Sequence, residues 1–275
     1  MSSVQSGCLY VVATPIGHRD DFSARAIETL RAVAVIAAED TRHSRPLLVH
    51  HNIDTPLIAL HDYNERDAVD AIVRRMAAGD SVALISDAGT PLISDPGFRL
   101  VRAARAAGIR CIPLPGACAA IAALSVAGLP SDRFVFEGFL PAKAAARRGR
   151  LQELAGDART VIFYESSHRV AESLADMRDI FGADREAVLA RELTKMFETV
   201  LGEPLAELAA WVVADPDQQR GEHVILVAGR GAEADAKLAE GQRVFAILRD
   251  ELPPAKAAKM AAAITGAPRK LLYEG

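Results

Sequence analysis

The amino-acid sequence predicts an α/β protein made of two α/β domains and a small C-terminal helical appendage, and three observations support this. Short apolar runs alternate with helix-like segments through residues 8–114. Such alternation implies a parallel sheet with covering helices, because parallel neighbours need a crossover connection. Strands and helices follow one another again between residues 133 and 229, and after Gly231 the chain becomes rich in Ala, Lys and Arg. We therefore expect domains at 1–115 and 116–231, and the appendage at 232–275.

The first domain is expected to hold five strands and four covering helices. Its β-branched, apolar runs predict strands at 8–14, 33–38, 56–60, 81–86 and 109–114. The segments between them predict helices at 23–32, 41–51, 65–79 and 98–108.

The second half of the chain begins with a candidate hinge. Pro115 and Gly116 end a strand, and the helix that follows consists almost entirely of small residues, so its backbone can approach a neighbour or a ligand closely. Apolar runs predict strands at 133–141, 160–166, 187–194 and 221–229, with helices near 144–154, 166–181 and 204–212. Near the end, Gly266 and Pro268 mark the turn of a short helix-turn-helix pattern.

Length, composition and charge limit the class of protein. The 275 residues, 50% of them hydrophobic, can bury one large core or two ordinary ones. No leader pattern is present and no apolar run approaches the roughly 18 residues of a membrane span, so we expect a cytoplasmic protein without a membrane partner. The net charge of −4 would confine any nucleic acid to one face.

Several common sites are not supported. Cys8, Cys111 and Cys118 lack the spacing of zinc ligands, so we expect reduced, buried cysteines and no metal site. GxGxxG, GxxxxGK[ST] and GxSxG motifs are missing, which leaves a dinucleotide-binding Rossmann site, a P-loop and a nucleophile elbow without support.

Two loops rich in Gly and Pro follow predicted strands. DAGTPLISDPG comes after the strand at 81–86, and TPIGH comes after the strand at 8–14. In open α/β sheets ligands bind outside the carboxyl ends of strands, where Gly admits a ligand to the backbone and Asp87 can accept hydrogen bonds or balance a cation. The alternative for each loop is a tight turn with solvated side chains. Because two such loops occur at the same edge of the sheet, a ligand-binding crevice is favoured over two unrelated turns.

Two polar clusters also follow predicted strands. AAEDTRHSRPLL places Asp40 and Arg42 at a strand's carboxyl end, where the alternative is a charged helix start. YESSHR, residues 164–169, repeats this arrangement, and its serines can instead cap the next helix. We interpret His50, His51 and His61 as solvated or hydrogen-bonded rather than as metal ligands.

Seven motifs in a fixed order carry a family resemblance: LYVVATPIGHRDDFSARAIETL, AAEDTRHS, DAGTPLISDPG, PLPGACA, FYESSHRV, RELTKMFE and GEHVILV. With them the chain resembles the tetrapyrrole methylase superfamily of S-adenosylmethionine-dependent enzymes, and within it the branch that methylates the ribose 2′-hydroxyl of a cytidine in 16S rRNA. The match covers nearly the whole chain. The resemblance implies a cofactor cleft between two α/β domains, a helix-turn-helix at the C-terminus and a homodimer.

The resemblance also implies which residues bind S-adenosylmethionine. Carried over by position, the expected contacts are Pro15, Ala88, Gly89, Thr90, Ile93, Cys118, Ala119, Glu165, Leu193 and His223, to which the loop itself adds Asp87. Many tetrapyrrole-type members have GGDP where this chain has AGTP, a departure that weakens a porphyrinoid substrate and agrees with the RNA-modifying branch.

For the chemistry, Asp40 is our first candidate base and Arg42 a candidate phosphate contact. Two groups of basic residues are candidates for holding the RNA of the small ribosomal subunit: Lys143, Arg147, Arg148 and Arg150, then Lys256, Lys259, Arg269 and Lys270. The alternatives are a methyltransferase of the same superfamily acting on a tetrapyrrole or a protein side chain, and a non-catalytic RNA-binding module.

Overall fold

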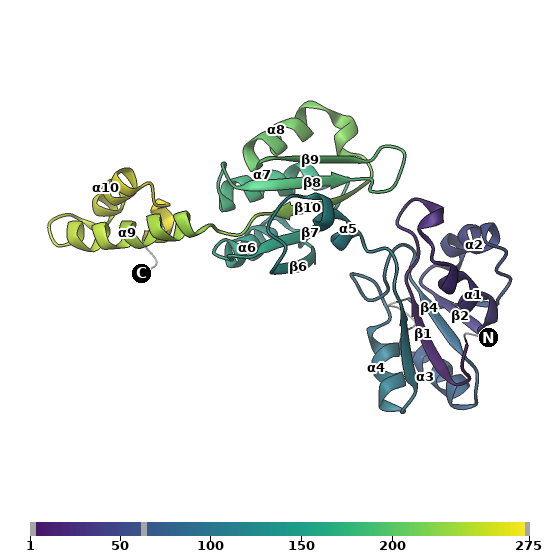
Figure 1. Ribbon diagram of the computed structural model, residues 1–275. Coiled ribbons are helices and arrows are strands. Elements are labelled where there is room, and N and C mark those ends of the chain that lie inside the picture. Colours follow the sequence, from purple (N-terminus) through teal and green to yellow (C-terminus); the bar gives the residue numbers. More distant parts are fainter. Residues whose placement is uncertain (1–3, 62–64, 273–275) are drawn as a thin grey trace.

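The computed structural model describes residues 4–61 and 65–272, which form two sheet-based units and a helical pair (Figure 1). The first sheet has the strand order β3-β2-β4-β1-β5. Its strands are β1 Cys8–Val12, β2 Val35–Ala38, β3 Leu57–Ala59, β4 Val82–Ile85 and β5 Arg110–Leu114. Every pairing in this sheet is parallel, which confirms the prediction from strand–helix alternation. Because β1 and β4 are neighbours, the loops at their carboxyl ends open side by side.

Helices cover both faces of the first sheet. The short η1 Arg19–Asp21 leads into α1 Ala24–Ala32, which packs on one face with α2 Thr41–His50. The other face is covered by α3 Glu65–Ala77 and α4 Phe98–Ala106. Side chains alternate between the two cores, since Leu9 faces one and Tyr10 the other. This sheet is therefore buried on both sides, as parallel sheets generally are.

The second sheet is mixed, with the order β6-β7-β10-β8-β9. Its strands are β6 Phe134–Phe139, β7 Thr160–Ser166, β8 Glu186–Arg191, β9 Thr199–Pro204 and β10 Glu222–Val227. Only β6 and β7 pair in parallel. We did not predict β9, because TVLGEP holds Gly, Glu and Pro in place of an apolar run. These residues suit an edge strand, which is where β9 lies.

The two faces of the second sheet differ in cover. On one face pack α6 Ala144–Leu154, α7 Val170–Phe181 and α8 Leu205–Ala214, the last followed by η2 Pro216–Gln219. On the other face lies the small-residue helix α5 Ala119–Val126, packed through Ala120 and Ala123. The same apolar cluster includes Ile16 from the loop after β1 and Leu193 from the loop after β8. This face therefore meets the first unit.

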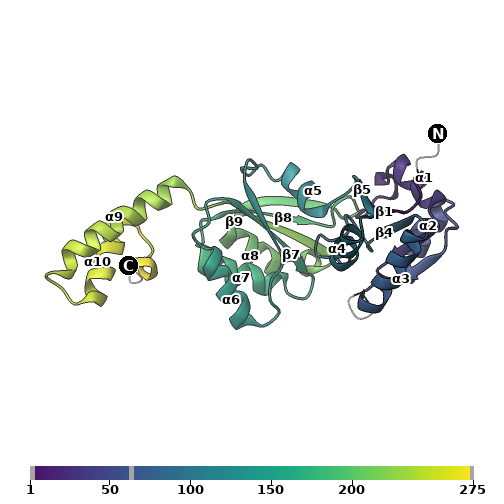
Figure 2. The same ribbon diagram turned by 90° about the horizontal axis from the view of Figure 1, so that it is seen from below.

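The C-terminal residues form a separate helical pair with its own small core. The helices α9 Ala232–Arg249 and α10 Pro254–Thr265 pack together with the turn η3 Arg269–Leu272 around Phe245, Ala261 and Leu272. Figures 1 and 2 both place this pair beyond the second sheet, at the end opposite to the first sheet.

The cysteines fit the expectation in part. All three thiols are free, but only Cys8 is buried, whereas Cys111 and Cys118 are half-buried. Cys118 lies at the start of α5, near the boundary between the two sheets, which explains its partial exposure.

Candidate active site

The loops after β1 and β4 are joined through their backbones. Thr14 N donates to Gly89 O at 2.8 Å, and Gly89 N donates to Thr14 O at 3.1 Å. Gly89 has a φ of +83°, and a Cβ at this position would lie 3.3 Å from Ile16 Cγ2. A tight turn and a close approach of two loops therefore explain this glycine, and they bring TPIGH and DAGTP to one edge of the sheet.

The loop after β5, which leads into α5, is bonded to the loop after β4. The Thr90 hydroxyl donates to Ala117 O at 2.8 Å, which links the loop after β4 to the segment that leads into α5. Residues 117–119 therefore lie next to the loop after β4. Three of the expected cofactor contacts, Thr90, Cys118 and Ala119, lie along this connection.

The second unit contributes the loop after β8, which meets the loop after β1. His18 N donates to Thr194 Oγ1 at 3.0 Å. A Cβ on Gly17 would lie 2.6 Å from Lys195 Cγ and 2.9 Å from Leu193 O, so only glycine fits here without a shift. The sequence motifs TPIGH and RELTK therefore face each other, although the sequence alone did not pair them.

Backbone strain is concentrated in these facing loops. Leu92 and Ser94 have φ values of 74° and 67° in the loop after β4, and Glu192 and Thr194 have 51° and 63° in the loop after β8. Apart from Asn52, these are all the non-glycine residues with positive φ in the described part of the chain. Such conformations cost of order 1–3 kcal/mol each and cluster at ligand sites.

A cavity of about 520 Å³ opens between the loops and the start of α2. Its lining residues are Thr14, Pro15, Ile16, Gly17, Arg19, Arg42, His43, Ser44, Pro46, Leu47, Ser86, Asp87, Ala88, Lys195 and Glu222. The Ser44 hydroxyl is buried with no hydrogen-bond partner. Pro15, Asp87, Ala88 and Arg42 were expected at a site and line this cavity together.

Asp40 has a clear structural role at the start of α2. Its carboxylate caps the helix by accepting a hydrogen bond from Arg42 N at 2.8 Å, and it pairs with the Arg42 guanidinium at 2.9 Å. The hydrogen bonds from the Arg42 side chain and backbone hold the pKa of Asp40 well below its usual range. The charged helix start, the alternative to a substrate site, is thus present. Asp40 N also donates to Asp87 Oδ1 at 3.1 Å, which joins α2 to the loop after β4.

Asp95, in the same loop after β4, has the opposite electrostatic character. Burial raises the pKa of its carboxyl to about 6, and the nearby charge of Asp87 adds to the effect. A carboxylate of this kind is a stronger proton acceptor than Asp40 near neutral pH. Sequence reasoning passed over Asp95, because nothing in SDPG signals burial.

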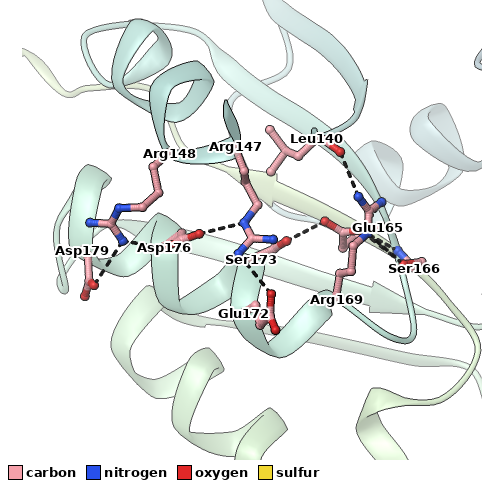
Figure 3. A network of polar contacts seen from close by, with 10 residues as sticks. All are labelled: Leu140, Arg147, Arg148, Glu165, Ser166, Arg169, Glu172, Ser173, Asp176 and Asp179. Carbon is pink, nitrogen blue, oxygen red and sulfur yellow. Dashed lines mark hydrogen bonds and ion pairs between the residues drawn. The ribbon is translucent and has the colours of Figure 1, made fainter. Parts of the chain in front are cut away.

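Two expected cofactor contacts lie on the far face of the second sheet. Glu165 accepts a hydrogen bond from the Ser173 hydroxyl at 2.6 Å and pairs with Arg169 at 2.8 Å (Figure 3). His223 is buried beside it in the sheet register, and its Nε2 donates to Gln218 O at 2.8 Å. Burial lowers the pKa of this imidazole. Both side chains point toward the α7 and η2 side, so any contact with a ligand in the cleft would have to come from their backbones.

The expectation that the basic residues of α6 contact RNA is wrong for Arg147. This side chain is buried and pairs with Asp176 at 2.7 Å and with Glu172 at 3.2 Å (Figure 3). Arg148 also pairs with Asp176, at 2.5 Å. These ion pairs fasten α6 to α7 and leave little free positive charge on α6.

Arg150 on α6 and the basic residues of the appendage differ in their surroundings. Arg150 pairs with Glu137 at 2.7 Å and with Glu153 at 2.6 Å. The side chains of Lys256, Lys259, Arg269 and Lys270 are exposed. The appendage is therefore the better supported of the two predicted basic surfaces.

Within residues 4–61 and 65–272, no three His, Cys, Asp or Glu side chains are grouped as they would be around a metal ion. The described helices include none with the length and apolar character needed to cross a membrane.

Two family models match the sequence. Residues 8–209 match the model of Tetrapyrrole (Corrin/Porphyrin) Methylases, and residues 235–274 match that of the RsmI C-terminal HTH domain. Among curated proteins, the chain is 60% identical over 273 residues to Ribosomal RNA small subunit methyltransferase I of Pseudomonas aeruginosa, with 98% of this chain and 97% of that protein covered. It is 52% identical to the protein of the same name from Escherichia coli O157:H7, with 98% and 94% covered.

Solved structures show the same fold at low identity. The methyltransferase CobJ superposes with a TM-score of 0.60 at 22% identity, covering 82% of this chain and 95% of that one. Uroporphyrin-III-C-methyltransferase from Thermus thermophilus superposes with a TM-score of 0.56 at 18% identity, covering 81% and 94%. The part of the chain left uncovered is in keeping with an additional C-terminal segment.

Proposed function

This chain belongs to the tetrapyrrole methylase family and, within it, to the relatives called ribosomal RNA small subunit methyltransferase I, and from this premise we propose that it methylates the ribose 2′-hydroxyl of a cytidine in 16S rRNA. The observation that carries the proposal is identity of 52–60% over nearly the full length of both chains. The matched C-terminal domain supports it further, because the low-identity tetrapyrrole-type neighbours leave about a fifth of this chain uncovered.

The residues around the cleft fit S-adenosylmethionine as the cofactor. The cavity of about 520 Å³ lies in the range of small-molecule sites, and its walls at Pro15, Ile16 and Ala88 are apolar. Polar groups converge on it, namely the Asp87 carboxylate and the unpartnered Ser44 hydroxyl. When bound, the cofactor supplies a methyl group already activated on its sulfonium. The protein is then left to align the 2′-oxygen and exclude water.

Two carboxylates are candidates for accepting the hydroxyl proton. Asp40 remains in the proposal because it lies beside the cavity, but its lowered pKa makes it a weak base. Asp95 interacts with Ser86, which lines the cavity, and its raised pKa is better suited to this role. If Asp40 takes part in the chemical step, Asp40→Asn lowers the single-turnover methylation rate more than it lowers cofactor affinity. An unchanged rate would leave Asp40 as a helix cap only.

Contacts to RNA are proposed at Arg42 and on the appendage. The Arg42 side chain is 90% exposed, and a guanidinium matches phosphate geometry. Arg42→Ala should therefore weaken RNA binding, measured by filter retention, more than it weakens cofactor affinity, because Arg42 also lines the cavity. Truncation before Glu233 should likewise leave cofactor affinity nearly intact and lower subunit affinity, and the difference should shrink as salt rises.

We further propose a cytoplasmic homodimer. In support, α5 and β6 expose Ile121, Val126 and Phe139 at the surface, each half or more exposed in the single chain. Large apolar side chains exposed to this degree are suited to a protein contact. Light scattering on the purified chain measures the mass directly, and a monomer at micromolar concentration would contradict the dimer.

The decisive experiment is transfer of a radiolabelled methyl group to purified small ribosomal subunits that lack the modification. We expect label in 16S rRNA, at a cytidine whose neighbouring phosphodiester resists alkaline hydrolysis, because a methylated 2′-oxygen cannot attack the phosphate. Label in ribosomal protein, or only in an added tetrapyrrole, would favour the alternative function, in which the enzyme methylates a protein side chain or a tetrapyrrole. Cofactor binding without any transfer would favour a non-catalytic RNA-binding module.

A further inference from the structure

The helix α5 begins without a capping side chain of its own. Its N-cap residue, Cys118, has the extended backbone of a helix cap (φ −146°, ψ 118°), but its side chain makes no capping hydrogen bond. The first amides of a helix lack partners within the helix, and Ser, Thr, Asp or Asn usually accept from one of them. Something else has to satisfy the start of α5.

Tyr164 on β7 supplies the missing acceptor from the second sheet. Ala120 N donates to the Tyr164 phenol oxygen at 3.0 Å, and Ala120 is the second residue of α5, the position that a capping side chain usually serves. The acceptor lies 44 residues further along the chain, so no local sequence rule predicts it.

The phenol ring is held firmly by its surroundings. Phe136 and Phe139 of β6 pack edge-on against it, with ring centroids 4.9 and 5.7 Å away. Burial raises the pKa of the Tyr164 hydroxyl, so it stays protonated at physiological pH. On the opposite face of β7, the neighbouring Glu165 is anchored by Ser173 and Arg169 (Figure 3). The end of β7 is thus fixed on both sides.

The segment that Tyr164 holds is the one expected at the cofactor. Ala117 O accepts from Thr90 Oγ1 at 2.8 Å on one side, and Ala120 N is bound by Tyr164 on the other. Between these two anchors lie Cys118 and Ala119. Any displacement of α5 would move both residues relative to the loop after β4.

We propose that Tyr164 is a positioning residue for S-adenosylmethionine. Its phenol oxygen takes the place of the missing side-chain acceptor at the N-cap of α5 and fixes residues 117–120 against the DAGTP loop. The capping role stands on the hydrogen bond itself. The link to the cofactor rests on the function proposed above.

The test is Tyr164→Phe, which keeps the ring and removes only the hydroxyl. Tyr10→Phe is the matched control, because Tyr10 is also buried and its hydroxyl also accepts from a backbone amide, Gln5 N at 2.7 Å, within the first unit. Hydrogen exchange at the Ala120 amide, measured without cofactor, shows whether the Tyr164 hydroxyl protects this amide. Calorimetry with S-adenosylmethionine, together with KM and kcat for methyl transfer, shows whether Tyr164 affects cofactor binding.

In Tyr164→Phe we expect about fivefold faster exchange at Ala120, in line with the loss of one hydrogen bond. We also expect about fivefold weaker cofactor affinity, a matching rise in the KM for S-adenosylmethionine and a kcat within twofold of the wild type. Tyr10→Phe should change none of these. Adding Cys118→Ser to Tyr164→Phe places a capping hydroxyl at the N-cap and should restore slow exchange at Ala120.

Each outcome supports or overturns the proposal. Wild-type exchange at Ala120 in Tyr164→Phe would refute the cap, and an equal loss of affinity in both variants would refute the specific positioning. Faster exchange with wild-type affinity would also refute the positioning. If the wild-type protein itself does not bind S-adenosylmethionine, the proposed function fails, and exchange at Ala120 still decides the capping role.

Discussion

Substituting Gly17 by alanine should separate the loop after β1 from the loop after β8, which meet across the cleft. The added Cβ would lie 2.6 Å from Lys195 Cγ and from Thr194 Oγ1, and 2.9 Å from Leu193 O. The lysine methylene can move aside, but the carbonyl must retreat by about 0.5 Å to reach ordinary contact. Gly17 does not have a positive φ, so alanine adds no backbone strain and the effect is steric alone.

The expected cost follows from these contacts. Overpacking costs roughly 1–3 kcal/mol, and loss of the hydrogen bond from His18 N to Thr194 Oγ1 adds about 1 kcal/mol. At about 2–4 °C per kcal/mol, the Tm should fall by about 4–16 °C. Because Leu193 is an expected cofactor contact, we also expect about tenfold weaker S-adenosylmethionine binding, since displacements near 1 Å can cost up to ~100-fold in function.

Differential scanning calorimetry and titration calorimetry measure the two effects. The control is Gly149→Ala within α6, where an added Cβ meets nothing within 4 Å. That variant should gain slightly in stability, because alanine favours a helix over glycine by about 1 kcal/mol. A Gly17→Ala protein with the Tm and cofactor affinity of the wild type would refute the reasoning, since it would mean that the loops do not touch in solution.

Three other substitutions test separate parts of the structure. Gly89→Val should lower the Tm, because a φ of +83° strains a β-branched residue, and it should abolish cofactor binding in calorimetry. Retained cofactor affinity would contradict this prediction. Arg147→Met should lower the free energy of unfolding by roughly 1–3 kcal/mol, because Asp176 loses its buried partner but keeps its ion pair with Arg148. RNA affinity should be unchanged below the Tm, and unchanged stability with weaker RNA binding would support a contact between Arg147 and RNA. For Asp95→Asn, the Tm difference from the wild type should grow more positive between pH 4 and pH 7. The reason is that the raised pKa of about 6 makes ionisation of Asp95 unfavourable in the folded state, so the wild type loses stability as pH rises; a flat difference would contradict burial.

Much of the fold was predictable because its signals are local. Apolar runs bounded by Gly and Pro located all five strands of the first sheet, and their alternation with helices implied the parallel pairing that the structure has. The edge strand β9 was missed, since a strand exposed along one side carries Gly, Glu and Pro in place of an apolar pattern. The loops TPIGH and DAGTP were recognised from composition, and the adjacency of β1 and β4 then brought them together.

What the sequence by itself determined is the set of loops at the carboxyl ends of the strands and the family motifs within them. Only the tertiary structure decided which side chains face the cleft. Alternation along β7 places Tyr164 and Glu165 on opposite faces, but packing of α5 on one face and α7 on the other determined that Tyr164 meets α5 and Glu165 does not. The sequence likewise did not predict the partners of Arg147 or the acceptor that caps α5, because these hydrogen bonds join residues 25–44 positions apart. Contacts at that separation depend on how whole elements pack, which no short stretch of sequence encodes.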